Sequence, residues 1–457
     1  MGPRTNWHVS ELIIQSRMPQ PNTESDQVAQ VVSLCKRRGI IFQNSEIYGG
    51  VQGFYDYGPV GSQMKLNWKN IWWTDNVIRR RDVVGIDGAI ITHPRVWEAS
   101  GHVKNFADPM VECKSCHKRF RPDLIDNATK CPECGGVFTE VKKYNVLFHT
   151  EIGVIEGEKM PAYLRGEACQ TIYLDFKNIV DSSRVKIPFG VAQIGKAFRN
   201  EITPKNFLYR TREFEQWDVQ YFVHPDSMDQ WYEYWKQLRL EWYQKYFNNT
   251  ESLRFRQHES DELAFYAKKA FDIEYNTPWG WAEMEGIHWR ADYDLTQHSK
   301  FSGQDLSYQD PITNVKYLPW IVEASGGVDR SFFFMLLDAY HQDTLENGDV
   351  RTWLQVHPKI AAYKAAVLPL AANKPEITAL SQSIFDKLSA TYSIDYDDSS
   401  NIGKKYRRQD EIGTPWCITV DFQSLTDQTV TIRVRNTMEQ FRHPIADLEN
   451  WLRIQLS

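Results

Sequence analysis

Two pairs of cysteines have the spacing of metal ligands. Cys113 and Cys116 form one Cys-x-x-Cys pair, Cys131 and Cys134 form a second, and fourteen residues separate the pairs. Two such knuckles can close a tetrahedral shell of four thiolates around Zn²⁺. Because four thiolates leave no open coordination position, we expect a structural zinc site rather than a catalytic one. A redox pair of cysteines is the alternative interpretation, and His117 is an alternative ligand.

Arginines on both sides of a polar stretch could bind phosphates. Residues 195–201 contain Arg199, and residues 209–214 contain Arg210. An arginine on a rigid strand can hold a phosphate through its planar fork, and a second one on a loop can reach the far end of a triphosphate. An aromatic ring after them can stack on a purine. An exposed hairpin laced by Arg–Glu pairs is an equally good interpretation of this segment taken alone.

A glycine pair before an expected helix is a third candidate site. The glycines are residues 326–327, and the helix is expected from Val328 to about residue 340. Glycines let a backbone approach a ligand closely, and the start of a helix favours an anion. Arg330 would lie in the first turn, where the helix dipole disfavours a cation. A bound phosphate would explain this arginine, and an ion pair with Asp329 or a nearby acid is the alternative.

A pair of strands is expected to position the arginines. Residues 191–223 contain two strand-like runs around a polar middle, which predicts an antiparallel hairpin with a functional loop. One face of the second run is polar and acidic, and the other is apolar. A polar face on a long strand pair is unusual for a core and suggests a ligand surface. The polar face carries Phe214, Gln216, Asp218, Gln220 and Phe222, and the apolar face carries Trp217, Val219, Tyr221 and Val223.

The whole chain divides into two folded units and an extension. Residues 1–25 are expected to be a polar extension, and residues 26–345 mix strands and helices without strict alternation. In residues 360–457 strands and helices alternate, which suggests a compact α/β domain with a mixed sheet. The predicted fold class is therefore α+β. The expected C-terminal strands are 365–370, 392–396, 416–421 and 429–435, and the expected helices are 376–390, 402–410 and 444–456.

Composition excludes some classes of protein. The chain has 457 residues, 42% of them hydrophobic, and a formal net charge of −6, which argues against a general basic coat. No run approaches the roughly 18 apolar residues that a membrane helix needs, and the N-terminus lacks the pattern of a secretory signal. We therefore expect a cytoplasmic protein without a membrane partner. The aromatic content of 13% is compatible with a dimer.

Together these segments resemble motifs 2 and 3 of the class II aminoacyl-tRNA synthetases. More narrowly, the chain from about Ser33 to its end resembles the homodimeric glycyl-tRNA synthetases in six ordered blocks. The blocks are IYGGVQGFYDYGPVG (47–61), the motif-1-like IDGAIITHPRVWEASGHV (86–103) with Pro94, the motif-2 hairpin, WAEMEGIHWRADYDLTQH (281–298), EASGGVDR (323–330) and KYRRQDEIGTPWCITVDF (405–422).

This resemblance implies a class II antiparallel-sheet catalytic domain over residues 26–345, with a zinc-binding insertion at 104–165. It implies an anticodon-binding α/β domain over residues 360–457, in which the basic and aromatic segment 402–408 contacts RNA. The implied enzyme is a glycine–tRNA ligase, which activates glycine with ATP and transfers it to the 3′ end of tRNA(Gly) in protein biosynthesis. The implied partners and cofactors are ATP with Mg²⁺, glycine, tRNA(Gly), Zn²⁺ and a second copy of the chain in a homodimer.

The resemblance also assigns the ATP site. Arg199 would grip the α-phosphate and Arg210 the γ-phosphate, while Arg330 would bracket the adenine ring and reach the γ-phosphate. Glu201 would read the adenine edge, and Phe214 would stack on the ring. The other expected members are Asn200, Tyr209, Thr211, Arg212, Glu213, Gly327, Val328 and Asp329, with Glu283 as the Mg²⁺ ligand and Met284 beside it.

Glycine offers no side chain to recognise, so its pocket must exclude a Cβ by steric clash while acids satisfy the ammonium group. The resemblance assigns Glu167, Glu323 and Ser325 to the ammonium group and Arg121 to a substrate contact. The block 166–171 departs from the family's Glu-Thr-Ala-Gln-Gly, although its glutamate and glutamine remain. The full expected set is Arg121, Glu167, Glu215, Gln216, Trp217, Asp218, Glu323, Ala324, Ser325 and Gly326.

In the implied reaction the glycine carboxylate attacks the α-phosphorus in line and pyrophosphate leaves. The carboxylate is already ionised, so catalysis comes from positioning and charge neutralisation rather than from a general base. One alternative is a class II synthetase for threonine, proline or serine, and another is a synthetase-like RNA-binding protein without activity. Within the pocket, ordinary ion pairs of Glu167 and Glu323 with Arg165 or Arg330 are the structural alternative.

Overall fold

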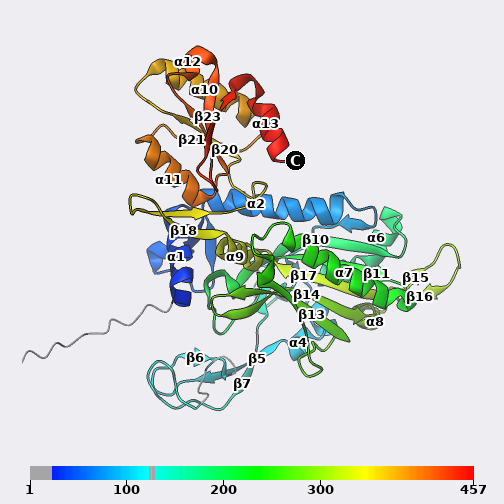
Figure 1. Ribbon diagram of the computed structural model, residues 1–457. Helices are drawn as coiled ribbons and strands as arrows, with labels where there is room; N and C mark the ends of the chain where they lie inside the picture. The colour runs from blue at the N-terminus through cyan, green and yellow to red at the C-terminus, as the bar shows by residue number, and fades with distance from the viewer. Residues whose placement is uncertain (1–22, 123–124, 126–128, 156) are drawn as a thin grey trace, which may run out of the picture.

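The computed structural model describes residues 23–122, 125, 129–155 and 157–457. The predicted extension 1–25 lies outside the described residues except for residues 23–25, which begin helix α1 (Thr23–Arg37). Figure 1 shows a central body built on one large sheet, with a C-terminal unit above it and a small lobe of strands below it.

The largest sheet among the described residues has seven strands in the order β12-β13-β14-β17-β11-β10-β3. Neighbouring strands are antiparallel, except for the parallel pair β10 and β3. The predicted hairpin is confirmed, because β10 pairs with β11 along its whole length. The predicted α+β class is also confirmed. The strands are β3 (Val83–Gly85), β10 (Phe189–Phe198), β11 (Glu213–Val223), β12 (Leu253–Gln257), β13 (Lys269–Thr277), β14 (Gly280–Ala291) and β17 (Trp320–Gly327).

Three helices cover one face of this sheet. They are α2 (Pro59–Trp73), α7 (Met228–Gln244) and α9 (Val328–Ala339). Trp217 of β11 lies here at ring distances of 5.6 Å from Trp68 and 5.6 Å from Trp72 of α2. The predicted helix after the glycine pair is confirmed as α9, and it is buried on nearly every side. Aromatic burial of this size makes the covered face the main core of the molecule.

The opposite face of the sheet is covered by helices at one end. The covering helices are α5 (Gln170–Leu174), α6 (Phe176–Ser183) and α8 (Tyr293–Ser302), which bury Phe222 of β11 and Ile321 of β17. Farther along the same face, β11 and β17 present the polar side chains of Gln216, Asp218 and Ser325. A polar half-face bordered by an apolar one is where a ligand can reach a rigid sheet.

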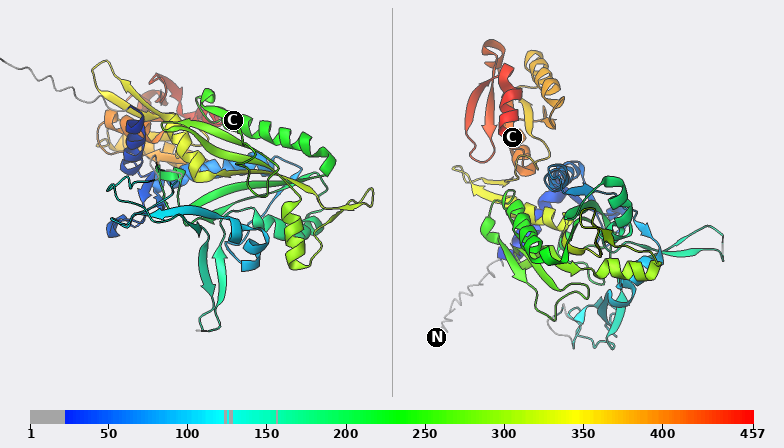
Figure 2. Two further views of the ribbon diagram at one scale, coloured as in Figure 1. Left: turned by 90° about the horizontal axis from the view of Figure 1, so that it is seen from below. Right: turned by 90° about the vertical axis from the view of Figure 1, so that its right-hand side faces the viewer.

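Short strands form a lobe and an arm beside the central body. The lobe contains the cysteine pairs and pairs β5 (Ala107–Glu112) with β6 (Arg119–Phe120) and β7 (Lys142–Asn145). The arm is the hairpin of β8 (Phe148–Ile152) and β9 (Met160–Leu164), which pairs with β4 (Ile91–Thr92) and projects from the body in both views of Figure 2. The remaining elements of this part are β1 (Ile41–Gln43), β2 (Tyr55–Tyr57), α3 (Pro94–Ala99), α4 (His102–Asn105), β15 (Tyr308–Gln309) and β16 (Lys316–Tyr317).

The C-terminal unit follows the hairpin of β18 (Tyr340–Thr344) and β19 (Val350–Leu354) and has a mixed sheet in the order β21-β20-β22-β23-β24. The first three strands of that order are parallel, and the last two pairs are antiparallel. The elements are β20 (Ala365–Pro369), α10 (Pro375–Ser389), β21 (Ile394–Tyr396), α11 (Ile402–Ile412), β22 (Trp416–Val420), α12 (Ser424–Asp427), β23 (Thr429–Val434), β24 (Gln440–Pro444) and α13 (Leu448–Gln455).

One strand of this unit was not predicted. The expected helix 444–456 is present as a 3₁₀ turn at Ile445–Asp447 that continues into α13, but strand β24 comes before it and ends at Pro444. This strand lies at the edge of the sheet and its side chains are exposed or half-buried, so its sequence QFRHP shows no apolar alternation. An edge strand is fixed by its backbone pairing with β23 rather than by burial, and that pairing leaves no sequence pattern.

Across the described residues, no helix is both long and apolar enough for a membrane span.

Candidate active site

A cavity of about 180 Å³ opens where the polar half-face meets the start of α9. Its walls come from both strands of the hairpin, from the 3₁₀ turn Phe207–Tyr209 between them, from β14 and from the junction of β17 with α9. The structure thus brings together three sequence blocks that are far apart along the chain. The lining residues are Arg199, Glu201, Leu208, Tyr209, Arg210, Thr211, Phe214, Gln216, Glu283, Ser325, Gly327, Asp329 and Arg330.

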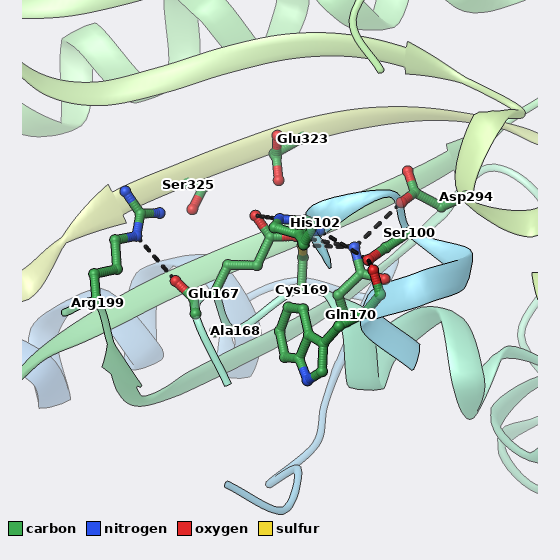
Figure 3. A network of polar contacts seen from close by, with 12 residues as sticks. Ser100, His102, Glu167, Ala168, Cys169, Gln170, Arg199, Asp294, Glu323 and Ser325 are labelled. Carbon is green, nitrogen blue, oxygen red and sulfur yellow. Dashed lines mark hydrogen bonds and ion pairs between the residues drawn. The ribbon is translucent and has the colours of Figure 1, made fainter. Parts of the chain in front are cut away.

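Arg199 is clamped between two aromatic rings at the end of β10. Its guanidinium carbon lies 5.0 Å from the ring centroid of Phe106 and 5.4 Å from that of Phe214. Its Nε donates to the carbonyl of Gly166 at 3.0 Å, as the dashed line at Arg199 in Figure 3 marks. The stacking and the single backbone bond fix the plane of the fork and leave its other donors for a ligand.

Arg330 is held by Tyr209 and Glu283, not by Asp329. Its guanidinium carbon lies 4.6 Å from the ring centroid of Tyr209, and its Nη1 lies 3.2 Å from Oε2 of Glu283. Burial alone would raise the pKa of Glu283, but the charges of Arg330, His288 and Arg199, together with the hydrogen bond from Arg330, lower it overall. Asp329 instead accepts hydrogen bonds from Tyr57 and Lys65, both at 2.5 Å. The alternative ion pair of Arg330 is therefore present with a nearby acid, Glu283, and not with Asp329.

Ion pairs of the kind that the alternative interpretation expected also occur in the hairpin, one between arginine and glutamate and one between lysine and glutamate. Arg210 lies 3.4 Å from Glu201 inside the cavity. Lys196 pairs with Glu213 on the exposed outer side. Arg212 donates from Nε to the carbonyl of Glu201 at 3.1 Å, which supports the turn itself. The two interpretations are compatible, because Arg199 and Arg330 face the cavity while the outer pairs stabilise its wall.

A chain of neutral hydrogen bonds forms the inner wall of the cavity. Gln216 accepts from the backbone N–H of Ala168 at 3.1 Å and donates to Oγ of Ser325 at 3.2 Å. Ser325 donates in turn to Asp218 at 3.0 Å. The wall therefore joins the start of α5 to β11 and β17, and it leads directly to a carboxylate.

Glu323 lies behind this wall and is fully paired. Its carboxylate oxygens lie 2.9 and 3.1 Å from Nη1 of Arg290, and one of them lies 2.6 Å from Nδ1 of His288. Gln220 donates a further hydrogen bond at 2.9 Å. Burial alone would raise the pKa of Glu323, but the charge of Arg290 and the hydrogen bond from His288 lower it to about 2. Glu323 is thus ionised, and its partner is neither Arg165 nor Arg330.

Glu167 occupies the far side of the same pocket (Figure 3). His102 lies 3.2 Å from one carboxylate oxygen, and Gln170 and Cys169 donate to the other at 2.9 and 3.0 Å. Burial acts to raise the pKa of Glu167, but the charge and hydrogen bond of His102 bring it well below the ordinary value. The expected alternative partner, Arg165, donates instead to the carbonyls of Lys196 and Gly88.

Asp218 is the third buried acid, and its environment differs from the other two. It accepts hydrogen bonds from Gln220 and from Ser325, both neutral, and within the described residues it forms no ion pair with a lysine, arginine or histidine. Burial and the charge of Glu323 raise its pKa well above the ordinary value. Side-chain atoms of Cys169, Asp218 and Glu323 all lie within 4.8 Å of one another. A small cation entering this pocket would therefore relieve a desolvated negative charge.

Several residues of the expected glycine set lie on the opposite face of the sheet. Glu215 forms ion pairs with Lys65 at 2.7 Å and Lys69 at 2.5 Å, and Trp217 is packed in the main core. On β17, Ala324 is buried in the same core, and a Cβ on Gly326 would lie 2.4 Å from the indole nitrogen of Trp217. Successive strand residues alternate between faces, so a contiguous run cannot line one pocket.

Other expected residues also act away from the cavity. Met284 and Val328 are buried in the main core. The backbone N–H of Asn200 donates to the carbonyl of Val146 at 2.7 Å. Arg121 pairs with Asp108 at 2.5 Å in the strand lobe and is not among the residues that line the cavity.

The four paired cysteines converge in the strand lobe. Their sulfur atoms lie within 4.8 Å of one another, with Sγ–Sγ distances of 3.4 Å between Cys113 and Cys134 and 3.7 Å between Cys116 and Cys131. A tetrahedral Zn²⁺ with bonds of about 2.3 Å would place its sulfur ligands about 3.8 Å apart. The cluster therefore fits a closed zinc site. His117 is exposed and turns to Glu112, so the alternative ligand is not part of the cluster.

Known proteins resemble the chain over nearly its whole length. Residues 364–455 match the family described as the anticodon binding domain. The glycine–tRNA ligase of Borreliella burgdorferi is 48% identical over 435 residues, which cover 94% of this chain and 98% of that protein. The corresponding ligase of Treponema denticola is 49% identical over 93% of this chain and 96% of its own. That of Clostridium kluyveri is 45% identical over 93% of this chain and 97% of its own.

The chain belongs to the glycine–tRNA ligase family. Membership of the glycine–tRNA ligases makes it an aminoacyl-tRNA synthetase, and the C-terminal mixed sheet is its anticodon-binding domain. The alternative of a synthetase for threonine, proline or serine is set aside by these comparisons.

Sequence reasoning missed the residues that hold the pocket acids. They are His102, His288 and Arg290, and all three fall inside blocks that carry the family resemblance. The sequence held a signal for His288 and Arg290, because alternation along β14 places both on the same face as Gly286. For His102 no such signal exists, because α4 is a single turn and only the fold brings it to Glu167.

Proposed function

We propose that the chain activates glycine with ATP to glycyl-adenylate and then transfers the glycine to the 3′ end of tRNA(Gly). The observation that carries the proposal is the contact between two oppositely charged compartments. An arginine-lined cavity adjoins buried carboxylates across the single wall of Gln216 and Ser325. The first compartment suits a triphosphate, and the second suits an ammonium group on a very small molecule.

In the activation step, the glycine carboxylate would attack the α-phosphorus as pyrophosphate leaves. Arg199 would bind the α-phosphate, because stacking between Phe106 and Phe214 orients its fork before the ligand arrives. Arg210 and Arg330 would bind the γ-phosphate from the turn and from α9. No proton moves in this step, so positioning and charge neutralisation supply the catalysis.

The adenine would lie against Phe214, with Glu201 reading its edge and Arg330 on its other side. Glu283 is half-exposed on the cavity wall, so a metal could reach its carboxylate. Mg²⁺ bound with ATP would supply further charge neutralisation on the phosphates. The same carboxylate forms the ion pair with Arg330.

Selection of glycine would come from lack of space combined with negative charge. The ammonium group would lie beside Asp218, where it gains the one uncompensated carboxylate of the pocket. Glu167 and Glu323 would complete its surroundings. The hydrogen-bonded wall of Gln216 and Ser325 would exclude a side chain, as an amino acid larger than glycine would have to break it.

The anticodon-binding domain would contact tRNA through α11, although fewer cations are available than its sequence suggests. Lys405 is buried and donates to the carbonyl of Pro369 at 2.7 Å, and Arg408 pairs with Asp397. Lys404 and Arg407 are exposed on the same helix. They are the residues of the basic segment that we expect to approach a phosphate.

We also propose a homodimeric, cytoplasmic enzyme with one structural Zn²⁺ held by the four paired cysteines. Aminoacylation of a tRNA(Gly) transcript with labelled glycine tests the proposed function as a whole. We expect charging that depends on ATP and is abolished by periodate oxidation of the 3′ terminal ribose. Folded protein that charges no tRNA(Gly) transcript in the presence of Mg²⁺ would contradict the proposal.

A further inference from the structure

A row of partner positions crosses five strands on the pocket face of the sheet. The row runs through Gln193, Asp218, Ser325, Gly286 and Asp272, each paired with the next across neighbouring strands. Four of these five positions carry polar side chains, and the fourth in order is a glycine. The glycine therefore leaves a gap in a continuous polar row, directly beside Ser325.

The ring of His288 fills this gap. A Cβ on Gly286 would lie 2.8 Å from Cε1 and 2.9 Å from Nε2 of this ring, and its next neighbour would be Asp272 at 3.7 Å. Gly286 is not among the glycines with positive φ, so its backbone does not require a glycine. The requirement comes from the side chain two residues later, which leans back over the same face.

The other side of the ring contacts the glycine pocket. Nδ1 of His288 lies 2.6 Å from Oε2 of Glu323. Because an ionised carboxylate only accepts hydrogen bonds, Nδ1 carries the proton and donates it. Burial lowers the pKa of His288, but the hydrogen bond to Glu323 and the charges of Glu323 and Asp272 raise it overall. The ring thus links the bare position Gly286 to a pocket acid.

The hydrogen bond that His288 donates also helps to orient the carboxylate of Glu323. Arg290 approaches both carboxylate oxygens through the same Nη1 atom, while its Nε and Nη2 are used by Asp294. One nitrogen placed between two oxygens does not fix the plane of a carboxylate. The constraint comes from two donors that each bind a single oxygen, Gln220 at Oε1 and His288 at Oε2, and among the described residues only His288 holds Oε2 in this way.

We infer that His288 is a positioning residue that orients Glu323 toward the ammonium group of glycine, and that Gly286 is bare so that the ring can reach this position. The inference rests on the proposed function, in which Glu323 contributes to the ammonium subsite. It assigns no contact between His288 and the substrate. The expected signature is a change in the KM for glycine without a matching change in the KM for ATP.

Two substitutions at His288 separate the hydrogen bond from the ring. In His288→Asn the amide nitrogen takes the place of Nδ1, while Cε1 and Nε2 are absent. In His288→Leu the donor is lost. We expect the KM for glycine in ATP–pyrophosphate exchange to rise about tenfold in His288→Leu and by much less in His288→Asn. His149→Leu, on the exposed strand β8, is the matched control and should match the wild type.

A double variant makes the test sharper. Gly286→Ala should displace the ring and raise the KM for glycine, because its Cβ meets Cε1 and Nε2. Asparagine at position 288 lacks both atoms, so Gly286→Ala combined with His288→Asn should have a lower KM for glycine than Gly286→Ala alone. Thermal unfolding of each variant shows that the protein is folded. This suppression is a readout that a purely structural role would not produce.

The outcomes distinguish this inference from the proposed function. A wild-type enzyme that shows no exchange with glycine would contradict the proposed function itself. Normal wild-type exchange with an unchanged KM for glycine in folded His288→Leu would overturn the role of His288. A double variant whose KM for glycine equals that of Gly286→Ala, or shows the sum of the two single effects, would overturn the role assigned to Gly286.

Discussion

Arg290 and Glu323 form a buried ion pair between the adjacent strands β14 and β17, with Nη1 2.9 and 3.1 Å from the two carboxylate oxygens. The same arginine also holds Asp294 at 2.8 and 2.9 Å. Its donors are thus used by two acids, and Arg290 makes no hydrogen bond or ion pair with Asp218. The pocket therefore contains one acid, Asp218, that is not paired with a cation from the part of the chain that the structure describes. This acid is available to the ammonium group of a substrate.

Substitution of Asp218 by asparagine should weaken glycine binding and stabilise the free protein. We expect the KM for glycine to rise about 10- to 100-fold, or about 1.5–3 kcal/mol, because a charged hydrogen bond to the ammonium group is lost. The KM for ATP should change little. Steady-state ATP–pyrophosphate exchange measures both values. An unchanged KM for glycine would remove Asp218 from the ammonium subsite.

The stabilising effect of Asp218→Asn should depend on pH. Burial and the charge of Glu323 raise the pKa of Asp218 in the folded protein above its unfolded value. Such a group favours the folded state most below the unfolded pKa, and this contribution is lost as pH rises through the folded pKa. The variant lacks the titration, so its stability relative to wild type should be greater at pH 8 than at pH 4. Urea unfolding without glycine at both pH values measures the difference.

Substitution of Arg199 by lysine should damage the chemical step more than binding. Lysine keeps the charge but loses the planar fork and the stacking between Phe106 and Phe214. We expect kcat for exchange to fall about 10²- to 10³-fold, because a preorganised contact to the transferred phosphorus centre is lost. Arg212→Lys is the matched control, since Arg212 supports the turn through backbone carbonyls and does not line the cavity. A similar kcat for both variants would contradict the role of Arg199.

Several residues that line the cavity could be predicted from the sequence, because each lies close to a strong local pattern. Arg199, Arg210 and Arg330 each lie next to a strong signal, either a strand pair or a glycine pair before a helix. Residues on contiguous runs were over-predicted, because Glu215, Trp217, Ala324 and Gly326 alternate onto the core face. The alternation of the second strand already places Trp217 on its apolar face, so strand parity alone excludes this residue from the pocket.

Other features depend on contacts that no local pattern encodes. Arg290 reaches Glu323 only because β14 pairs with β17, and His102 reaches Glu167 only because the fold brings α4 next to the segment that precedes α5. Strand β24 was missed because it is short, polar and at an edge. The predicted four-cysteine cluster, in contrast, follows from spacing alone and is present as a cluster in the lobe. Short-range spacing in the sequence thus predicts a local cluster, while contacts between distant segments can be identified only in the structure.

The cysteine cluster should bind one zinc ion that holds the strand lobe together. We expect about one zinc per chain in purified protein, measured by mass spectrometry of metals, and none in Cys131→Ser, which removes a buried sulfur ligand. Limited proteolysis of this variant should cut within the lobe, while the central sheet stays resistant. Cys35→Ser, at an isolated buried cysteine, is the control and should keep the metal. Wild-type protein free of zinc after metal-supplemented expression would contradict the assignment.

A second buried ion pair should contribute to stability without contributing to catalysis. Arg239 of α7 donates to Glu285 of β14 at 2.5 and 3.1 Å, and Trp217 and Tyr243 donate to the same carboxylate. We expect Glu285→Ala to lower the free energy of unfolding by about 3–5 kcal/mol, because it leaves the buried guanidinium unpaired. Combining it with Arg239→Met should recover part of the loss. Urea unfolding measures the cycle, and additive losses in the double variant would contradict the pairing.

ATP–pyrophosphate exchange with each of the twenty amino acids in turn tests the central claim most directly. The account predicts exchange with glycine, which falls sharply in Asp218→Asn, and exchange with alanine and serine that is lower by at least two orders of magnitude. Folded protein that exchanges alanine or serine as well as glycine would contradict the closed pocket behind Gln216 and Ser325. Folded protein supplied with Mg²⁺ that exchanges with no amino acid would contradict the enzyme itself.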